Sequence, residues 1–295
     1  MKLVTFRAVG TAHEAIGVLH DDGSVTDLAA DPALPVTMID FVALGRAGLD
    51  GAAAVAGTGT AISADQIELL APIRPRNNVM AVGRNYYDHA QEFSDSGFDA
   101  SEVKVVPDYP IVFTKANSSI VGPTDPIDIS NDPLQRSDYE GELGVVIGPG
   151  GKRIMKNAAW DHVYGYTVVN DVTARLLQHQ HVQFFIGKSP DTYCPMGPCI
   201  VTRDELVDIS SARLTTVVNG ELRQDATISM LIFDIPTLIE TLSAAIRLEA
   251  GDVIATGTPV GTGMGLEPPV YLAAGDLVEV SVEGIGTISN PVING

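Results

Sequence analysis

The chain has 295 residues, of which 45% are hydrophobic and 19% charged, and its formal net charge is −19 at pH 7. Disordered chains have fewer apolar residues, so this composition predicts a folded protein with a sizeable core. The strong negative charge repels nucleic-acid phosphates and anionic lipid headgroups, which argues against both as partners.

Neither a signal peptide nor a membrane span is evident in the sequence, because no apolar run approaches the roughly 18 residues of a span. Its two cysteines, Cys194 and Cys199, suit a pair of buried thiols better than a disulfide framework or a zinc site. We therefore expect a cytoplasmic protein.

Residues 1–75 are predicted to form a small N-terminal, β-rich domain. Strands are expected at 3–6 and 15–19, and the Asp-Asp-Gly run after the second strand has the turn chemistry of a hairpin. A short helix is expected around 38–44. A low-complexity connector should follow over 51–60, since that run holds only Gly, Ala, Val and Thr.

Two closely spaced prolines within 72–77 discourage regular structure and mark the start of a second domain, residues 76–295. Short strands are predicted at 78–82, 142–148, 164–170, 214–218, 221–223, 275–282 and 285–288, with helices at 172–183 and 235–246. The polar run over 94–110 is expected to be a mobile loop that closes over a substrate. The predicted fold class is α+β and mainly β, not an alternating β-α-β sheet.

Three carboxylates are the candidate metal ligands. Glu140 and Glu142 are two residues apart in a predicted strand, so their side chains project from one face and repel each other unless a cation lies between them. Asp171, at the end of another predicted strand, is the third. Such an oxygen-donor set suits Mg²⁺, with Mn²⁺ or Ca²⁺ as alternatives. For the Glu-x-Glu pair alone, a solvated strand face is the simpler interpretation.

Two further patterns suggest substrate chemistry. Arg175 and Gln178 are predicted to share a helix face with Asp171, and a cation with an amide suits a bound oxyanion. His89 and Glu92 are spaced i, i+3 at the start of another predicted helix. A carboxylate that orients an imidazole is what a general base for water requires, although the pair also fits an ordinary helix surface.

Seven motifs in this order resemble the fumarylacetoacetate hydrolase family, from about Val79 to the C-terminus. They are residues 82–92, 113–115, 138–143, 170–175, 187–189, 194–198 and 256–259. The resemblance implies a mixed β-barrel-like roll, a catalytic divalent metal, a homodimer and a small N-terminal domain in front of the catalytic one.

The resemblance also implies roles for individual residues. The metal ligands would be Glu140, Glu142 and Asp171, the water-activating pair His89 and Glu92, the active-site lysine Lys188, and the substrate contacts Arg84, Gln178 and Thr258. Two positions depart from the family pattern. Leu176 stands where aspartate is common, and Pro190 stands where an aromatic or aliphatic residue is commoner.

The leading functional hypothesis is a metal-dependent hydrolase that cleaves a C–C bond in a β-diketo acid, such as an acylpyruvate or fumarylpyruvate. The same site suits an oxaloacetate-type decarboxylase, a hydratase or a tautomerase, and motifs shared by all of these enzymes do not separate them. A non-enzymatic metal or ligand sensor is a further alternative. The expected partner is a small 2-oxo or diketo acid.

Overall fold

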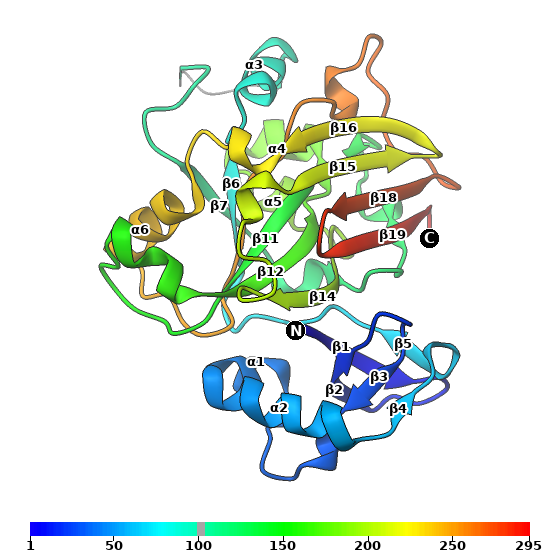
Figure 1. Ribbon diagram of the computed structural model, residues 1–295. Coiled ribbons are helices and arrows are strands. Elements are labelled where there is room, and N and C mark those ends of the chain that lie inside the picture. Colours follow the sequence, from blue (N-terminus) through cyan, green and yellow to red (C-terminus); the bar gives the residue numbers. More distant parts are fainter. Residues whose placement is uncertain (99–103) are drawn as a thin grey trace.

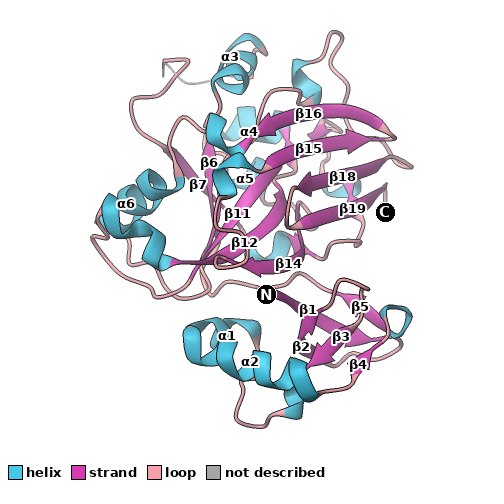
Figure 2. Ribbon diagram, viewed as in Figure 1, coloured by secondary structure: helices cyan, strands magenta, loops and turns pink. Residues whose placement is uncertain are grey.

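The computed structural model describes residues 1–98 and 104–295, and more of these residues lie in strands than in helices (Figures 1 and 2). The helices do not alternate regularly with the strands along the chain. The fold is therefore α+β and mainly β, as predicted.

Among the described residues, the larger sheet has the order β4-β3-β2-β1-β14-β12-β11-β17-β6-β7, with β5 beside β1 and β8 beside β14. Its strands are β1 (Lys2–Ala8), β2 (Glu14–Leu19), β3 (Val25–Asp27), β4 (Ala61–Ile62), β5 (Ile67–Leu69), β6 (Val79–Gly83), β7 (Ile111–Lys115), β8 (Ile120–Val121), β11 (Gly141–Ile147), β12 (Val163–Asn170), β14 (Cys194–Thr202) and β17 (Val253–Ala255). The sheet is mixed, because β17 runs parallel to β6 whereas β11, β12 and β14 pair antiparallel.

A second sheet, β16-β15-β18-β19-β9, packs over β11 and β12 (Figure 1). Its strands are β9 (Ile127–Asp128), β15 (Arg213–Val218), β16 (Glu221–Thr227), β18 (Leu277–Val282) and β19 (Gly286–Ile293). Leu214 and Val280 lie in the same buried cluster as Val145 and Tyr166, so the two sheets share one core. A separate short ladder joins β10 (Ser137–Asp138) to β13 (Thr173–Ala174).

The N-terminal strands extend the larger sheet, since β1 pairs with β14 through Lys2–Val201 and Leu3–Ile200 (Figure 1, blue). Two helices, α1 (Met38–Ala43) and α2 (Arg46–Thr58), lie beside these strands. The predicted connector over 51–60 is wrong, because most of it belongs to α2. Alanine is the best helix former, and buried Ala52 and Val55 give this helix an apolar face despite its glycines.

In the rest of the described residues there are four α-helices: α3 (Tyr87–Asp95), α4 (Arg175–His181), α5 (Phe185–Lys188) and α6 (Ile235–Ala245). The predicted helix over 172–183 begins too early, because Thr173 and Ala174 pair with β10 as a strand instead. The helix over 235–246 is confirmed, with the Asp234 side chain accepting a hydrogen bond from Thr237 N at its start.

The predicted loop over 94–110 is only partly within the described residues, because 99–103 lie outside them and 94–95 complete α3. Closure of this loop over a substrate stays a prediction. Both cysteines are buried free thiols, as expected. No helix in 1–98 or 104–295 has the length and apolar character needed to cross a membrane.

Candidate active site and metal centre

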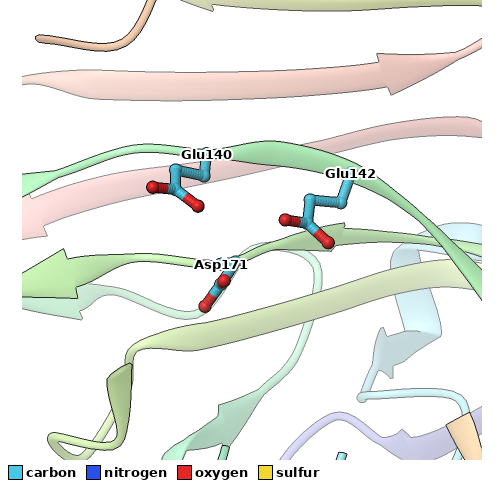
Figure 3. A group of neighbouring side chains, drawn as sticks. All are labelled: Glu140, Glu142 and Asp171. Atoms are coloured by element: carbon cyan, nitrogen blue, oxygen red, sulfur yellow. The ribbon is translucent and has the colours of Figure 1, made fainter. Parts of the chain in front are cut away.

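Three buried carboxylates converge where β11 and β12 meet (Figure 3). Glu140 immediately precedes β11, Glu142 is its second residue, and Asp171 follows β12. The backbone register holds them together, because Asp171 N donates to Glu140 O at 2.8 Å. One oxygen from each carboxylate lies within 4.8 Å of the others. The structure thus brings together the three residues that the sequence proposed as metal ligands.

Two buried lysines contact this carboxylate cluster. Lys188 Nζ lies 2.7 Å from Glu140 Oε2 and 2.6 Å from Asp171 Oδ2. Lys115 Nζ lies 2.6 Å from the other oxygen of Asp171 and donates to Val172 O. Sequence reasoning gave Lys115 no role, although it stands in one of the seven motifs. The available signal was a lysine shortly after the apolar run 111–113.

Arg175 pairs with two carboxylates of the chain itself, and its contact with a bound oxyanion stays a prediction. Its guanidinium is fully buried, with Nη2 2.7 Å from Asp138 Oδ2 and Nη1 2.6 Å from Glu140 Oε1. Burial lowers the pKa of Arg175, but the charges of Asp138 and Glu140 raise it more. Asp138 is a second residue that sequence reasoning missed, since nothing in the motif told its side chain apart from a solvent-facing one.

The carboxylates differ in their electrostatics. Burial raises the pKa of Glu140, but Lys188 and Arg175 outweigh it and lower that pKa to about 2. Burial and the charges of Asp171 and Glu140 raise the pKa of Glu142 well above its ordinary range. A divalent cation among the three would offset this repulsion, and hard oxygen donors are the ligands that Mg²⁺, Mn²⁺ and Ca²⁺ take. The residues present therefore fit such a metal.

His89 and Glu92 form a hydrogen-bonded pair on α3. His89 Nδ1 lies 2.9 Å from Glu92 Oε2. The carboxylate also accepts from Gly261 N at 3.0 Å and from the Thr262 hydroxyl at 2.9 Å. Burial raises the pKa of Glu92, but His89 and these donors lower it overall. An ionised carboxylate thus orients the imidazole and leaves Nε2 to take up a proton.

His89 and Glu140, one of the three carboxylates, line the same small cavity of about 20 Å³. Its lining residues are Gly83, Arg84, His89, Phe93, Phe113, Glu140, Gln178, Phe184 and Lys188. The Arg84 guanidinium lies 4.7 Å from the Phe93 ring centroid, and its backbone has a φ of +54°, which is uncommon for a residue with a side chain. Predicted substrate contacts Arg84 and Gln178 and the predicted base His89 therefore line one space.

Thr258 lies outside the lining of this cavity. Its hydroxyl donates to Gly141 O at 2.9 Å and accepts from Gln224 Nε2 at 2.8 Å, so it braces the start of β11. The neighbouring Gly257 N donates to Glu142 Oε2 at 2.9 Å. A direct contact between Thr258 and substrate stays a prediction.

Comparisons with known proteins point to one family. Residues 78–293 match the family model described as fumarylacetoacetate (FAA) hydrolase C-terminal. The oxaloacetate tautomerase YisK of Bacillus subtilis (strain 168) is 48% identical over 231 residues, which cover 78% of this chain and 74% of that protein. The mitochondrial oxaloacetate tautomerase fahd2 of Xenopus laevis is 40% identical over 298 residues, covering 99% of this chain and 90% of that protein.

A solved structure has a similar fold, and that protein was solved with a metal ion. It is described as maleylpyruvate hydrolase from Sphingobium sp. SYK-6 in complex with manganese(II) ion and pyruvate. It matches with a TM-score of 0.82 at 27% identity over the whole of both chains. With a family model that matches most of the chain and a relative similar along nearly all of it, the protein belongs to the fumarylacetoacetate hydrolase family.

Proposed function

We propose that the protein is a divalent-metal-dependent tautomerase that interconverts the keto and enol forms of a small 2-oxo dicarboxylic acid of the oxaloacetate kind. One observation carries this proposal: the base candidate His89, backed by Glu92, lines the same small cavity as Arg84, Lys188 and Glu140. The oxaloacetate tautomerases of Bacillus and Xenopus, similar over most of this chain, support the choice of substrate.

A cation held by Glu140, Glu142 and Asp171 would act as a Lewis acid that polarises the 2-oxo group. The remaining work falls to the protein's own side chains. His89 Nε2 takes a proton from C3, the C–H electron pair forms the C2–C3 double bond, and the carbonyl pair moves onto the C2 oxygen, which takes a proton from water to give the enol. The imidazolium then releases its proton to water. In the opposite direction, water takes the enol O–H proton and the imidazolium gives a proton to C3.

Three side chains of the cavity suit the anionic parts of such a substrate. Arg84 and Gln178 offer N–H donors to a carboxylate. Burial lowers the pKa of Lys188, but Asp171 and Glu140 raise it overall, so the ammonium stays charged. A fixed positive charge beside the developing oxyanion stabilises it, at roughly 3 kcal/mol for one well-placed donor.

The direct test follows the decay of enol-oxaloacetate absorbance with purified protein and Mg²⁺ or Mn²⁺. We expect decay well above the metal-only rate, with neither CO₂ nor pyruvate released. Release of CO₂ at the same rate would identify a decarboxylase instead. Decay no faster than with metal alone, for each metal, would contradict the proposal.

Hydrolysis of a C–C bond is the second candidate, because the His89–Glu92 pair also suits deprotonation of a water molecule. The maleylpyruvate hydrolase that shares the fold supports it. An acylpyruvate and fumarylpyruvate panel, with pyruvate as the measured product, separates the two candidates. Pyruvate release without any acceleration of tautomerisation would favour the hydrolase over the tautomerase.

A further inference from the structure

A five-residue segment, Gly261–Gly265, contacts both sides of the site. Its first two residues hold the base pair: Gly261 N donates to Glu92 Oε1 at 3.0 Å and the Thr262 hydroxyl donates to Glu92 Oε2 at 2.9 Å. Within residues 1–98 and 104–295, these two donors and His89 are the hydrogen-bond partners of this carboxylate. The segment therefore determines where Glu92 stands behind His89.

The next two residues of Gly261–Gly265 contact Asp138, which lies next to the candidate metal ligands. Gly263 N donates to Asp138 Oδ1 at 2.7 Å, and Met264 N donates to Asp138 Oδ2 at 3.1 Å. Asp138 in turn pairs with Arg175, which pairs with Glu140. A continuous series of hydrogen bonds and ion pairs thus leads from the segment to a candidate metal ligand.

Gly265 closes the segment directly against Glu92. A Cβ atom at this position would lie 2.0 Å from Glu92 Oε1, 2.3 Å from Cδ and 2.4 Å from Cγ, so an added methyl group must displace the carboxylate. No backbone atom is among these three nearest atoms, and Gly265 is exposed beside a hollow of about 470 Å³ that Glu92 and Met264 also line. An alanine here should shift Glu92 and leave the fold in place.

We propose that Gly265 is a positioning residue for the general base, and that Gly261–Gly265 fixes the base pair and the metal carboxylates relative to each other. Because Gly265 has no side chain, the Glu92 carboxylate can lie where Gly261 N, the Thr262 hydroxyl and His89 all contact it. The proposal rests on the proposed function only in taking His89 as the base of the reaction.

The first test is Gly265→Ala, assayed for turnover and for metal affinity by calorimetry. We expect kcat to fall at least about 100-fold, as for loss of a general base, with KM for the substrate and Kd for Mn²⁺ changed less than about threefold. Gly57→Ala is the matched control, because a Cβ at this exposed helical glycine meets nothing within 4 Å. It should leave all three constants unchanged.

A double-mutant cycle with Glu92→Ala separates positioning from general loosening, because the shortened side chain leaves room for an added methyl group at position 265. If Gly265 acts only through Glu92, the double variant should have a kcat within about threefold of Glu92→Ala alone. Multiplied losses in the double variant, or wild-type turnover in Gly265→Ala, would overturn the proposal. If the wild type has no tautomerase activity, the same cycle applies to whichever reaction the substrate panel reveals, so the two proposals fail separately.

Two more variants test the contacts that the segment makes with Glu92 and with Asp138. Thr262→Val removes one donor to Glu92 at nearly constant volume, and we expect a smaller loss of kcat without a change in metal affinity. Asp138→Asn weakens the hold on Arg175 and should raise the Kd for Mn²⁺ at least about tenfold. An unchanged Kd in a folded Asp138→Asn protein would contradict the metal half of the proposal.

Discussion

The carboxylates Glu140, Glu142 and Asp171 stand at strand ends of the central sheet, whereas His89 and Glu92 stand on α3, a helix of nine residues outside that sheet. Backbone pairing between β11 and β12 fixes the carboxylates, and buried ammonium and guanidinium groups neutralise them. Side-chain hydrogen bonds to a loop fix the base pair.

This difference separates two functions within one site. The metal side depends on sheet register, which changes only if the fold changes, whereas the base side depends on a few contacts that single substitutions alter. We infer that the loops around the base side select the reaction, because the motifs that hold the metal carboxylates and the base pair suit a tautomerase and a hydrolase equally. Substitutions on one side should therefore leave the other intact.

The largest effect is expected from Glu142→Gln on the metal side. Burial and its two neighbours raise the pKa of Glu142, so the amide should relieve repulsion and stabilise the metal-free protein. It should also remove the metal response. In the wild type, chelation should lower the melting temperature and abolish activity, and Mg²⁺ or Mn²⁺ should restore both, with roughly 2.7 kcal/mol gained at 100 times Kd.

Differential scanning fluorimetry with and without metal checks this prediction. The side chain of Glu142 is only 1% exposed, so an amide of the same size is a safer replacement than alanine, which would leave a cavity. A variant that keeps the full wild-type shift with Mn²⁺ would show that Glu142 is not a ligand.

His89→Ala should give the next largest effect and should be confined to the base side. We expect turnover to fall by roughly 10² to 10⁴ because the general base is lost. Calorimetry with Mn²⁺ should give the wild-type Kd, since His89 has no hydrogen bond to the three carboxylates within the described part of the chain. Unchanged turnover would favour a binding or sensor protein, and a lost metal response would mean that the two sides are not separable.

A stability effect is expected from Lys115→Met. The ammonium lies 2.6 Å from Asp171 Oδ1 and both side chains are fully buried, so the substitution leaves a buried carboxylate with less compensation. Breaking such a pair typically costs about 3 to 5 kcal/mol. Urea unfolding of the metal-free protein measures it. Arg46→Met, which breaks an exposed pair with Asp50, is the control and should change the free energy of unfolding by less than about 1 kcal/mol.

The two sides of the site also differ in how far the sequence predicts them. Carboxylates two residues apart on a strand share a face by geometry, and the i, i+3 spacing of His89 and Glu92 does the same on a helix. These short-range patterns predicted the two pairs, whereas Asp171 was proposed from its place at a strand end and Lys188 from the family resemblance. The ion pairs of Lys115 and Arg175 were not predictable, because these two residues find their partners across 56 and 37 residues of chain and no local pattern distinguishes a buried ion pair from a surface charge.

The same distinction between local patterns and long-range contacts decides which elements of the fold the sequence predicts. Elements defined by local chemistry were predictable: the Asn219–Gly220 turn has both residues at positive φ, as its hairpin requires, and Asp234 caps α6. The ladder between β10 and β13 was not predictable, since Thr173 becomes a strand residue only through its pairing with Asp138. Alanine-rich α2 was missed for a different reason, because low sequence complexity obscured a strong helix propensity.

The smallest effect, and the most specific to the base side, concerns pH. The pKa of Glu92 is lowered in the fold from its ordinary 4.5, chiefly by His89 against the opposing effect of burial. A carboxyl whose folded pKa is depressed stabilises the protein above the unfolded pKa, and that stability is lost as pH falls through the folded pKa. Glu92→Gln should therefore reduce the free energy of unfolding by about 1 kcal/mol at pH 7. The difference from wild type should shrink below pH 4.5, in metal-free urea titrations from pH 7 to 3.5.

Glu267→Gln is the control for this prediction and should follow the wild type. Glu267 is exposed and lines the same hollow as Glu92. A difference that stays constant across this range would mean that Glu92 contributes through packing and not through its charge, and the base side would then lack the ionised carboxylate that orients His89.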